Sequence, residues 1–232
     1  SVKKDEKSGF VILNSHQLAA ILLKIWKDSG KYEDMVCLKS IHTSDLIENM
    51  AIRSGLKFQS EIIEPGDLRT KMAEVQKVYE NSPICAFNID QQVCHSALDF
   101  SKIIVEIAQK ENELKSSGQT FFDYLMEIYN EFGFYKEKTI TVDLNTDAQR
   151  SHLLSIMDNL RKNPPKEIGG MKVTSVTDFL DTKGKLGPIK SKTDAASRNV
   201  LVYRCGEFAK IALRPSGTEP KAKIYLEVCT AP

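Results

Sequence analysis

Over its first ninety residues the chain alternates between short apolar runs and segments in which apolar side chains recur every three to four residues. The short runs are typical of strands, and the longer periodic segments are typical of amphipathic helices. Strands that alternate with helices favour an α/β layer with parallel strand pairs, because parallel neighbours need a crossover connection. We expect strands at 11–13, 35–38, 58–63 and 83–87, and helices that begin at Ser15, at Thr43 or Ser44, and after Pro65–Gly66.

Two further helices are expected before this pattern changes. One carries Phe100, Ile103, Ile104 and Ile107 on a buried stripe, and the other begins near Thr120 and ends at Gly133. The polar stretch 111–118 between them indicates a solvated helix-to-helix connection. We place a domain boundary near residues 135–138, so that residues 1–136 form the α/β domain.

The remaining residues, 137–232, show a different pattern of several strand-like runs and one helix. A hairpin turn is expected at Cys205–Gly206, and the Lys-, Ser- and Gly-rich stretch 183–198 is expected to be a long polar loop or flap. This composition favours a small α+β domain with an antiparallel sheet. The expected strands are 139–142, 171–176, 199–203, 209–213 and 223–228, with a helix capped by Asn145 or Thr146.

Composition and charge exclude several classes of protein. The chain is 41% hydrophobic and has 32 basic against 31 acidic residues, which argues against disorder and against a general nucleic-acid partner. The longest apolar run, 18–23, is too short to span a bilayer, so no membrane partner is expected. Five scattered cysteines without a Cys-x-x-Cys pair favour a reducing, cytoplasmic location.

Several histidines and cysteines have side chains that could bind a metal or transfer protons. Cys85, Cys94 and His95 are soft potential metal ligands, but their spacing matches no common zinc pattern and no fourth ligand is evident. We therefore expect no metal in this chain. His42, beside an expected helix cap, suits either acid–base chemistry or a plain hydrogen-bonding role.

A polar loop between two apolar strands carries the strongest chemical signal, the sequence Arg-Pro-Ser-Gly-Thr-Glu-Pro-Lys at 214–221. A guanidinium, an ammonium, two hydroxyl groups and an exposed glycine backbone all suit the binding of an oxyanion. The same Ser, Gly and Pro residues also suit a simple chain reversal. The candidate anion-binding residues are Arg214, Ser216, Gly217, Thr218 and Lys221.

This loop, followed by a strand, resembles the phosphate-binding loop of the α-D-phosphohexomutases, the family of phosphoglucomutases and phosphomannomutases. Residues 11–22, 39–47 and 129–135 are also similar to segments of the family's third domain, and the ending 229–232 is similar to that of the phosphoglucomutase-2/phosphopentomutase-like branch. Family members have four domains. The resemblance implies that this chain corresponds to the C-terminal half, the third and fourth domains.

The resemblance also implies an activity for the intact protein, the interconversion of sugar 1-phosphates and sugar 6-phosphates through a sugar bisphosphate. In the family, a phosphorylated serine of the first domain transfers the phosphoryl group, and Mg²⁺ is held by an Asp-rich loop of the second. Neither loop is present here, so no catalytic residue is expected in this chain. The implied partners are a hexose or pentose phosphate and the upstream domains of the same enzyme. By the same resemblance, Arg214, Ser216, Gly217, Thr218 and Lys221 bind the substrate phosphate that is not transferred, while Glu219 and Pro220 shape the loop.

Two sugar-contacting motifs of the family are altered. Residues 64–69 replace a Gly-Phe-Lys type loop, and residues 86–92 replace a Phe-x-Glu-Glu-Ser-x-Gly segment. Asn88 and Asp90 remain candidates for contact with sugar hydroxyls, with a plain strand-end loop as the alternative. These departures leave open a second interpretation, a divergent, non-catalytic paralogue that binds phosphosugars.

Overall fold

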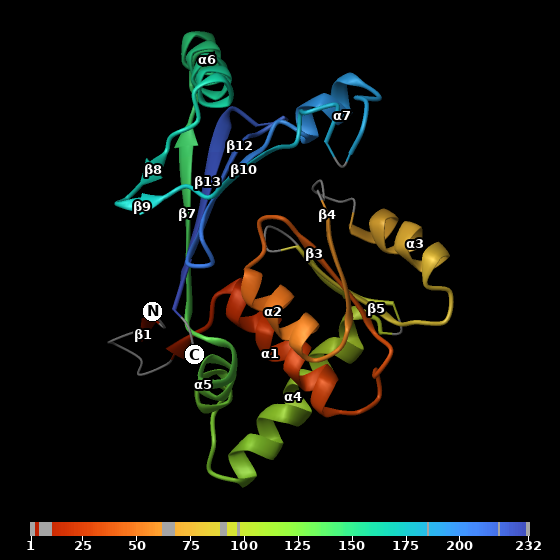
Figure 1. Ribbon diagram of the computed structural model, residues 1–232. Coiled ribbons are helices and arrows are strands. Elements are labelled where there is room, and N and C mark those ends of the chain that lie inside the picture. The colour runs from red at the N-terminus through yellow and green to blue at the C-terminus, as the bar shows by residue number, and fades with distance from the viewer. Residues whose placement is uncertain are drawn as a thin grey trace. The chain divides into compact units, whose positions relative to one another are not determined.

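The computed structural model describes residues 3–4, 11–61, 68–88, 92–96, 98–184, 186–217 and 219–230. The chain divides into two compact units, one of residues 1–135 with 231–232 and one of residues 136–230 (Figure 1).

A four-stranded sheet forms the centre of the first unit, in the order β4 (Lys57–Glu61), β3 (Val36–Ser40), β5 (Ile84–Asn88) and β6 (Gln92–His95). Strand β3 pairs in parallel with both β4 and β5, and β6 is antiparallel to β5. Every residue of β3 is buried, as expected for a central strand covered on both faces. The expected α/β layer is confirmed.

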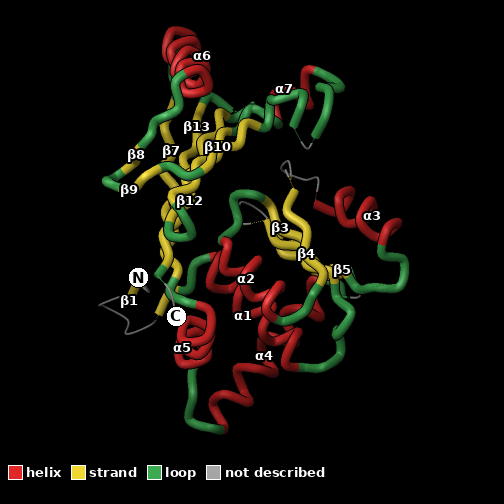
Figure 2. The backbone as a smooth tube through the Cα atoms, viewed as in Figure 1, coloured by secondary structure: helices red, strands yellow, loops and turns green. Residues whose placement is uncertain are grey.

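Helices cover both faces of this sheet, as the backbone trace shows (Figure 2). Helix α3 (Leu68–Val78) packs Leu68, Met72 and Val75 against one face. On the other face, the Trp26 side chain of α1 lies 5.8 Å from the Phe87 ring of β5, measured between centroids. The remaining helices of the unit are α1 (Ser15–Asp28), α2 (Asp45–Arg53), α4 (Phe100–Ser116) and α5 (Phe121–Phe132).

Three features of the first unit differ from the sequence-based expectation. The expected strand at 11–13 is only β2 (Val11–Ile12), which pairs with β1 (Lys3–Lys4) outside the main sheet, because Asn14 already caps α1. The stretch 111–116 belongs to α4, where the Lys115–Glu111 ion pair of 2.8 Å supports a solvated helix. Strand β6 was not expected. The end of the expected strand 58–63, residues 62–63, lies outside the described residues.

A five-stranded sheet forms the second unit, and four successive strands of this sheet pair antiparallel. Helix α6 (Asp147–Lys162), capped by Thr146, packs Met157 and Leu160 against one face of this sheet. The expected antiparallel sheet with a helix is confirmed. The strand order is β10 (Ser175–Asp178), β11 (Leu201–Cys205), β12 (Ala209–Pro215), β13 (Lys221–Cys229) and β7 (Tyr135–Asp143).

Two expectations for the second unit were wrong in detail. The run 171–176 is split between β9 (Met171–Lys172), which pairs with β8 (Glu167–Ile168), and β10. The polar stretch 183–198 contains a short helix, α7 (Lys192–Ser197), because the Ser191 hydroxyl accepts a hydrogen bond from the Asp194 N–H at 3.0 Å. Lys185 of this stretch lies outside the described residues.

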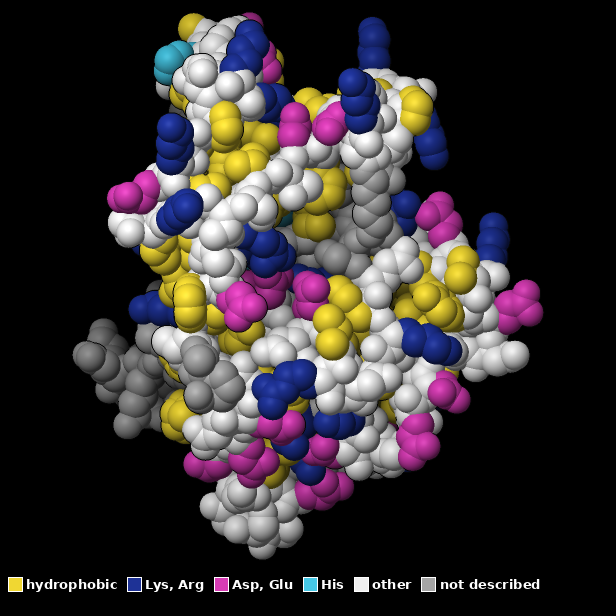
Figure 3. Space-filling view, in the orientation of Figure 1, with side chains coloured by type: hydrophobic (Ala, Val, Ile, Leu, Met, Phe, Trp, Pro, Cys, Tyr) yellow, Lys and Arg dark blue, Asp and Glu magenta, His cyan; other side chains and the backbone are white. Residues whose placement is uncertain are grey.

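Basic and acidic side chains are interspersed on the visible surface, in keeping with the near-zero net charge (Figure 3). Among the described helices, none is long and apolar enough to cross a bilayer.

Candidate functional site

The 214–221 loop connects β12 to β13, two antiparallel neighbours of the second unit. Their register places Arg214 opposite Lys223 and Pro215 opposite Ala222. Past this pair, the Ser216 N–H donates to the Lys221 carbonyl oxygen at 2.8 Å, and the Lys221 N–H donates to the Glu219 carbonyl oxygen at the same distance. The loop is therefore a short closed turn with defined backbone geometry at both ends.

The alternation of side chains along β12 separates the two faces of the hairpin. Ile211 and Leu213 belong to the core cluster that contacts α6, so Arg214 points to the opposite face. Lys223, the cross-strand partner of Arg214, lies on this same face, and so does Lys221, two residues before it. Three cationic side chains thus share one face at the end of the hairpin.

Lys223 was not identified as a candidate from the sequence. The signal that was available is its spacing, since residues two apart on a strand share a face. Lys221 is a candidate from the loop sequence, and the expected strand 223–228 begins at Lys223 itself.

Within the loop, Lys221 is paired with an acidic neighbour. Its Nζ lies 2.8 Å from Glu219 Oε1. The Ser216 Oγ accepts a hydrogen bond from the Glu219 N–H at 3.1 Å, which leaves the hydroxyl proton of Ser216 able to donate. Thr218 lies outside the described residues. The loop therefore offers hydroxyl and ammonium donors, with Glu219 as an internal competitor for Lys221.

The other side of the loop borders a pocket of about 270 Å³ against α6. Ser216 and Gly217 line this pocket, whereas Arg214 and Lys221 do not. The Leu144 N–H donates to the Pro220 carbonyl oxygen at 2.7 Å, which fastens the loop to the connection before α6. A Cβ built on Gly217 would lie 3.4 Å from the Ala196 Cβ, so α7 also lies against the loop.

The other candidates have a different setting. The Asn88 side chain at the end of β5 is only 5% exposed, and Asp90 lies outside the described residues. His42 is buried. A different histidine, His16, accepts a hydrogen bond at Nδ1 from the Ser44 N–H at 3.0 Å, which gives His16 a structural role at the start of α2.

The candidate metal ligands Cys85, Cys94 and His95 lie on two faces of the first sheet. His95 packs against Trp26 of α1, with 4.8 Å between ring centroids, whereas Cys94 belongs to the cluster beneath α3. Burial raises the pKa of the Cys85 and Cys94 thiols and lowers the pKa of His95 to about 4. Both thiols are therefore held in the form that binds metals poorly. In the described part of the chain, no group of three His, Cys, Asp or Glu side chains is arranged to hold a metal ion.

Comparison with known sequences supports the resemblance carried by the loop. No family model matches the chain. Phosphoglucomutases of Staphylococcus aureus strains MRSA252 and N315 are each 27% identical, over 238 and 233 residues respectively. Each alignment covers 97% of this chain and 42% of the relative. The chain thus spans about two-fifths of the length of these relatives and is similar to their C-terminal part.

Solved structures show the same fold. The open form of the phosphoprotein pp63/parafusin, a phosphoglucomutase from Paramecium, aligns with a TM-score of 0.64 and 13% identity, over 97% of this chain and 38% of that chain. A phosphomannomutase-like protein from Thermus thermophilus aligns with a TM-score of 0.57 and 11% identity, over 95% of this chain and 39% of that one. These structural matches show the fold, and the sequence matches show that the chain is similar to the C-terminal part of phosphoglucomutases.

Proposed function

We propose that this chain is the C-terminal part of a phosphohexomutase that interconverts sugar 1-phosphates and sugar 6-phosphates through a sugar bisphosphate. In this proposal the β12–β13 loop holds the phosphate that is not being transferred. One observation carries it: Arg214 and Lys221 share a sheet face at the end of a hairpin whose sequence matches the family's phosphate loop. The alignment with a phosphoglucomutase, which covers 97% of the chain at 27% identity, supports the same assignment.

The chemistry of the loop suits a sugar phosphate. The Arg214 guanidinium has the planar donor geometry for two parallel bonds to one phosphate group. Lys221 would exchange its contact with Glu219 for the phosphate, and the Ser216 hydroxyl would donate a further bond. Gly217 and Thr218 complete the proposed set, through a backbone N–H and a hydroxyl group. Because each charge-assisted bond contributes about 1.5–3 kcal/mol, a few of them offset the desolvation of the ligand.

The remaining parts of the reaction are assigned to the upstream domains. We assign the phosphoserine and the Mg²⁺ site to the first and second domains of the intact enzyme. A hexose or pentose phosphate is the proposed substrate. We propose a cytoplasmic location, which is in keeping with five scattered cysteines that form no Cys-x-x-Cys pair.

A second candidate function is a non-catalytic paralogue that binds phosphosugars. The low exposure of Asn88 favours it, because little of that side chain is available to a sugar hydroxyl. The altered segments at 64–69 and 86–92 point in the same direction. The phosphate loop would be retained in either case.

The first test is the mass of the native polypeptide, measured by blotting source cells with an antibody against this chain. A product more than twice the 26.1 kDa of this chain supports the enzyme and allows its mutase activity to be assayed with glucose 1-phosphate. In that enzyme Arg214→Gln should raise KM at least about 10-fold, whereas the control Lys162→Gln, at an exposed position in the last turn of α6, should not. A native product near 26 kDa that binds phosphosugar supports the second function, and an unchanged KM in Arg214→Gln would contradict the proposed role of the loop.

A further inference from the structure

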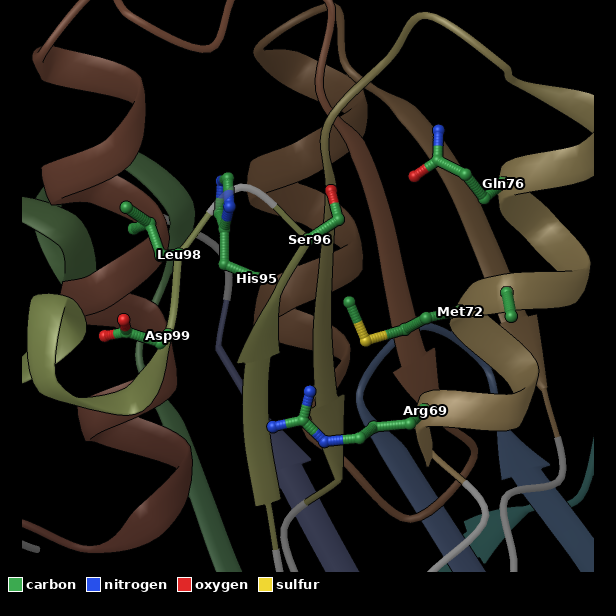
Figure 4. A pocket seen from close by; sticks show the side chains of 8 residues that line it. Arg69, Met72, Gln76, His95, Ser96, Leu98 and Asp99 are labelled. Atoms are coloured by element: carbon green, nitrogen blue, oxygen red, sulfur yellow. The ribbon is translucent and has the colours of Figure 1, made fainter.

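A pocket of about 430 Å³ opens in the first unit between α3, the end of β6 and the start of α4. Its lining residues come from α3 on one side and from the turn between β6 and α4 on the other (Figure 4). None of them belongs to the β12–β13 loop. The volume is within the range of about 300–1,000 Å³ that is usual for small-molecule sites. The lining residues are Arg69, Met72, Ala73, Gln76, His95, Ser96, Leu98 and Asp99.

Arg69 provides the positive charge of this pocket. Its side chain is exposed, and within the described residues it makes no hydrogen bond or ion pair. Burial lowers the pKa of His95 to about 4, so that the imidazole is neutral at neutral pH and adds no second cation. The guanidinium is therefore available to an anionic group of a ligand.

Within the pocket, an apolar surface separates Arg69 from a polar end that is formed by Ser96 and Gln76. Figure 4 shows the Met72 side chain between Arg69 and the pair Ser96 and Gln76. Ala73 and Leu98 extend the apolar lining. A ligand that reaches from one end to the other must therefore carry an apolar body.

The polar end has defined hydrogen-bonding capacity. The Gln76 Nε2 donates to the carbonyl oxygens of Tyr79, Glu80 and Ser82, which leaves Oε1 as an acceptor. The Ser96 Oγ accepts from the Ile84 N–H at 2.7 Å, so its hydroxyl proton can be donated. This end suits a small polar group or water.

The presence of Ser96, His95 and Asp99 in one pocket does not make a nucleophilic triad. The Asp99 carboxylate caps α4, accepting from the Lys102 N–H at 2.9 Å. The His95 ring packs between Trp26 and Tyr32, with centroid distances of 4.8 and 4.4 Å. Each group has a structural role, which favours binding over covalent chemistry.

We propose that this pocket binds a small monocarboxylate with an apolar chain, its carboxylate on Arg69 and its chain along Met72, Ala73 and Leu98. The negative charge of Asp99 disfavours a dianion, so inorganic phosphate and phosphosugars bind weakly here. The inference is independent of the proposed mutase function, because the two sites share no residue.

Trp26, the single tryptophan of the chain, reports on this pocket, since it contacts the lining residue His95. Titration of the whole chain with hexanoate should change Trp26 fluorescence saturably, with calorimetry as an independent measurement of the same binding. Hexanol, the neutral analogue, and inorganic phosphate should each bind at least about 10-fold more weakly than hexanoate. Equal binding of hexanol and hexanoate, or no saturable binding by either method at millimolar hexanoate, would overturn the proposal.

Two variants separate this site from non-specific binding. Arg69→Gln, on an exposed position of α3, should weaken hexanoate binding about 10-fold or more. Ala73→Leu should fill the pocket and abolish binding, whereas Ala108→Leu, on an exposed position of α4, should bind hexanoate normally. Full binding by either pocket variant would place hexanoate elsewhere and contradict the proposal.

Discussion

Arg214 and Lys223 are in-register partners on the antiparallel strands β12 and β13, and their side chains leave the sheet on the face opposite α6. Like charges directly opposite each other are unfavourable unless an anion lies between or near them. Because Lys223 shares this face with Arg214 at the end of the proposed phosphate loop, we propose that it assists Arg214 in holding the phosphate.

Lys223→Gln should therefore weaken the binding of glucose 6-phosphate by about 3- to 10-fold, since one exposed charge contact is lost. Calorimetry on this chain or on the intact enzyme measures the change. The matched control is Lys172→Gln, an exposed lysine of β9, which should bind the ligand as the parent chain does. Equal affinities for Lys223→Gln and the control would remove Lys223 from the site.

Glu219 competes with a bound phosphate for Lys221, because its Oε1 lies 2.8 Å from the Lys221 Nζ. Glu219→Gln removes this competition and a repulsive negative charge, while retaining the length of the side chain. The affinity for glucose 6-phosphate should rise by about 3-fold or more. A loss of affinity would show that Glu219 is needed to shape the loop.

Lys39 is a buried cation of the first unit, with a side chain that is 2% exposed. Its Nζ contacts Asp45 Oδ1 at 2.6 Å and Glu48 Oε2 at 3.5 Å, and donates to the Thr43 carbonyl oxygen at 3.2 Å. Lys39→Met should lower the free energy of unfolding by about 3–5 kcal/mol, because acidic partners lose their counterion. Urea denaturation followed by Trp26 fluorescence measures this unit.

The control for Lys39 is Lys71→Met, which breaks a more exposed ion pair with Glu74 on α3. Its effect should stay within about 1 kcal/mol. If the two substitutions lower the free energy of unfolding equally, the burial of Lys39 does not make its ion pairs more stabilising than an exposed pair.

The layered architecture of the first unit could be predicted because its strands and helices have distinct periodicities. Strand β6 was harder to predict from the sequence, because it is a four-residue edge strand of mixed polarity whose pairing depends on β5. The length of α4 was underestimated because residues 111–116 have no apolar stripe, and their helix is supported by local charge pairs such as Lys110–Glu113.

The residues of the candidate site also divide into those that the sequence predicts and those that only the structure shows. Arg214 and Lys221 could be selected from the loop sequence, but Lys223 required the register of β12 and β13. The pocket beside Arg69 could not be predicted, because it joins residues of α3 to residues some 25 positions later, next to the unexpected strand β6. Contacts of this kind depend on tertiary packing rather than on local sequence pattern.

His95 makes the stability of the first unit dependent on pH. Burial lowers its pKa to about 4 from an unperturbed value of 6.5. Between these values the unfolded chain binds a proton that the folded chain does not, so stability is complete above about pH 6.5 and is lost as the pH falls towards 4. The loss attributable to His95 amounts to about 3 kcal/mol.

This loss is measured by urea denaturation at several pH values, followed by Trp26 fluorescence. His95→Gln should flatten the difference in stability between pH 7 and pH 4 relative to the parent chain, although it is less stable at pH 7. His152→Gln, at an exposed position of α6, should retain the parent dependence. The same pH slope in His95→Gln and the parent would show that other groups cause it.

Arg198 organises the polar segment that precedes it. Its side chain is buried and donates to the carbonyl oxygens of Phe179 at 2.8 Å, Gly187 at 2.9 Å and Pro188 at 3.3 Å. The carbonyl oxygen of Phe179 comes before the polar stretch 183–198, and those of Gly187 and Pro188 lie within it. The Asp194 carboxylate lies 3.5 Å from the same guanidinium. The Arg198 side chain thus joins backbone carbonyl groups of Phe179, Gly187 and Pro188 to the end of α7.

Arg198→Gln should release the segment, because the shorter glutamine side chain has two N–H donors and no charge in place of the five donors of the guanidinium. Local opening then becomes easier, and trypsin should cut after Lys190 at least about 10-fold faster, as measured by mass spectrometry of timed digests. The unfolding transition seen by Trp26 should be unaffected, since that residue lies in the first unit. Arg150→Gln serves as the control, and cleavage after Lys190 at the parent rate in Arg198→Gln would mean that α7 and its Ser191 cap hold the segment without the guanidinium.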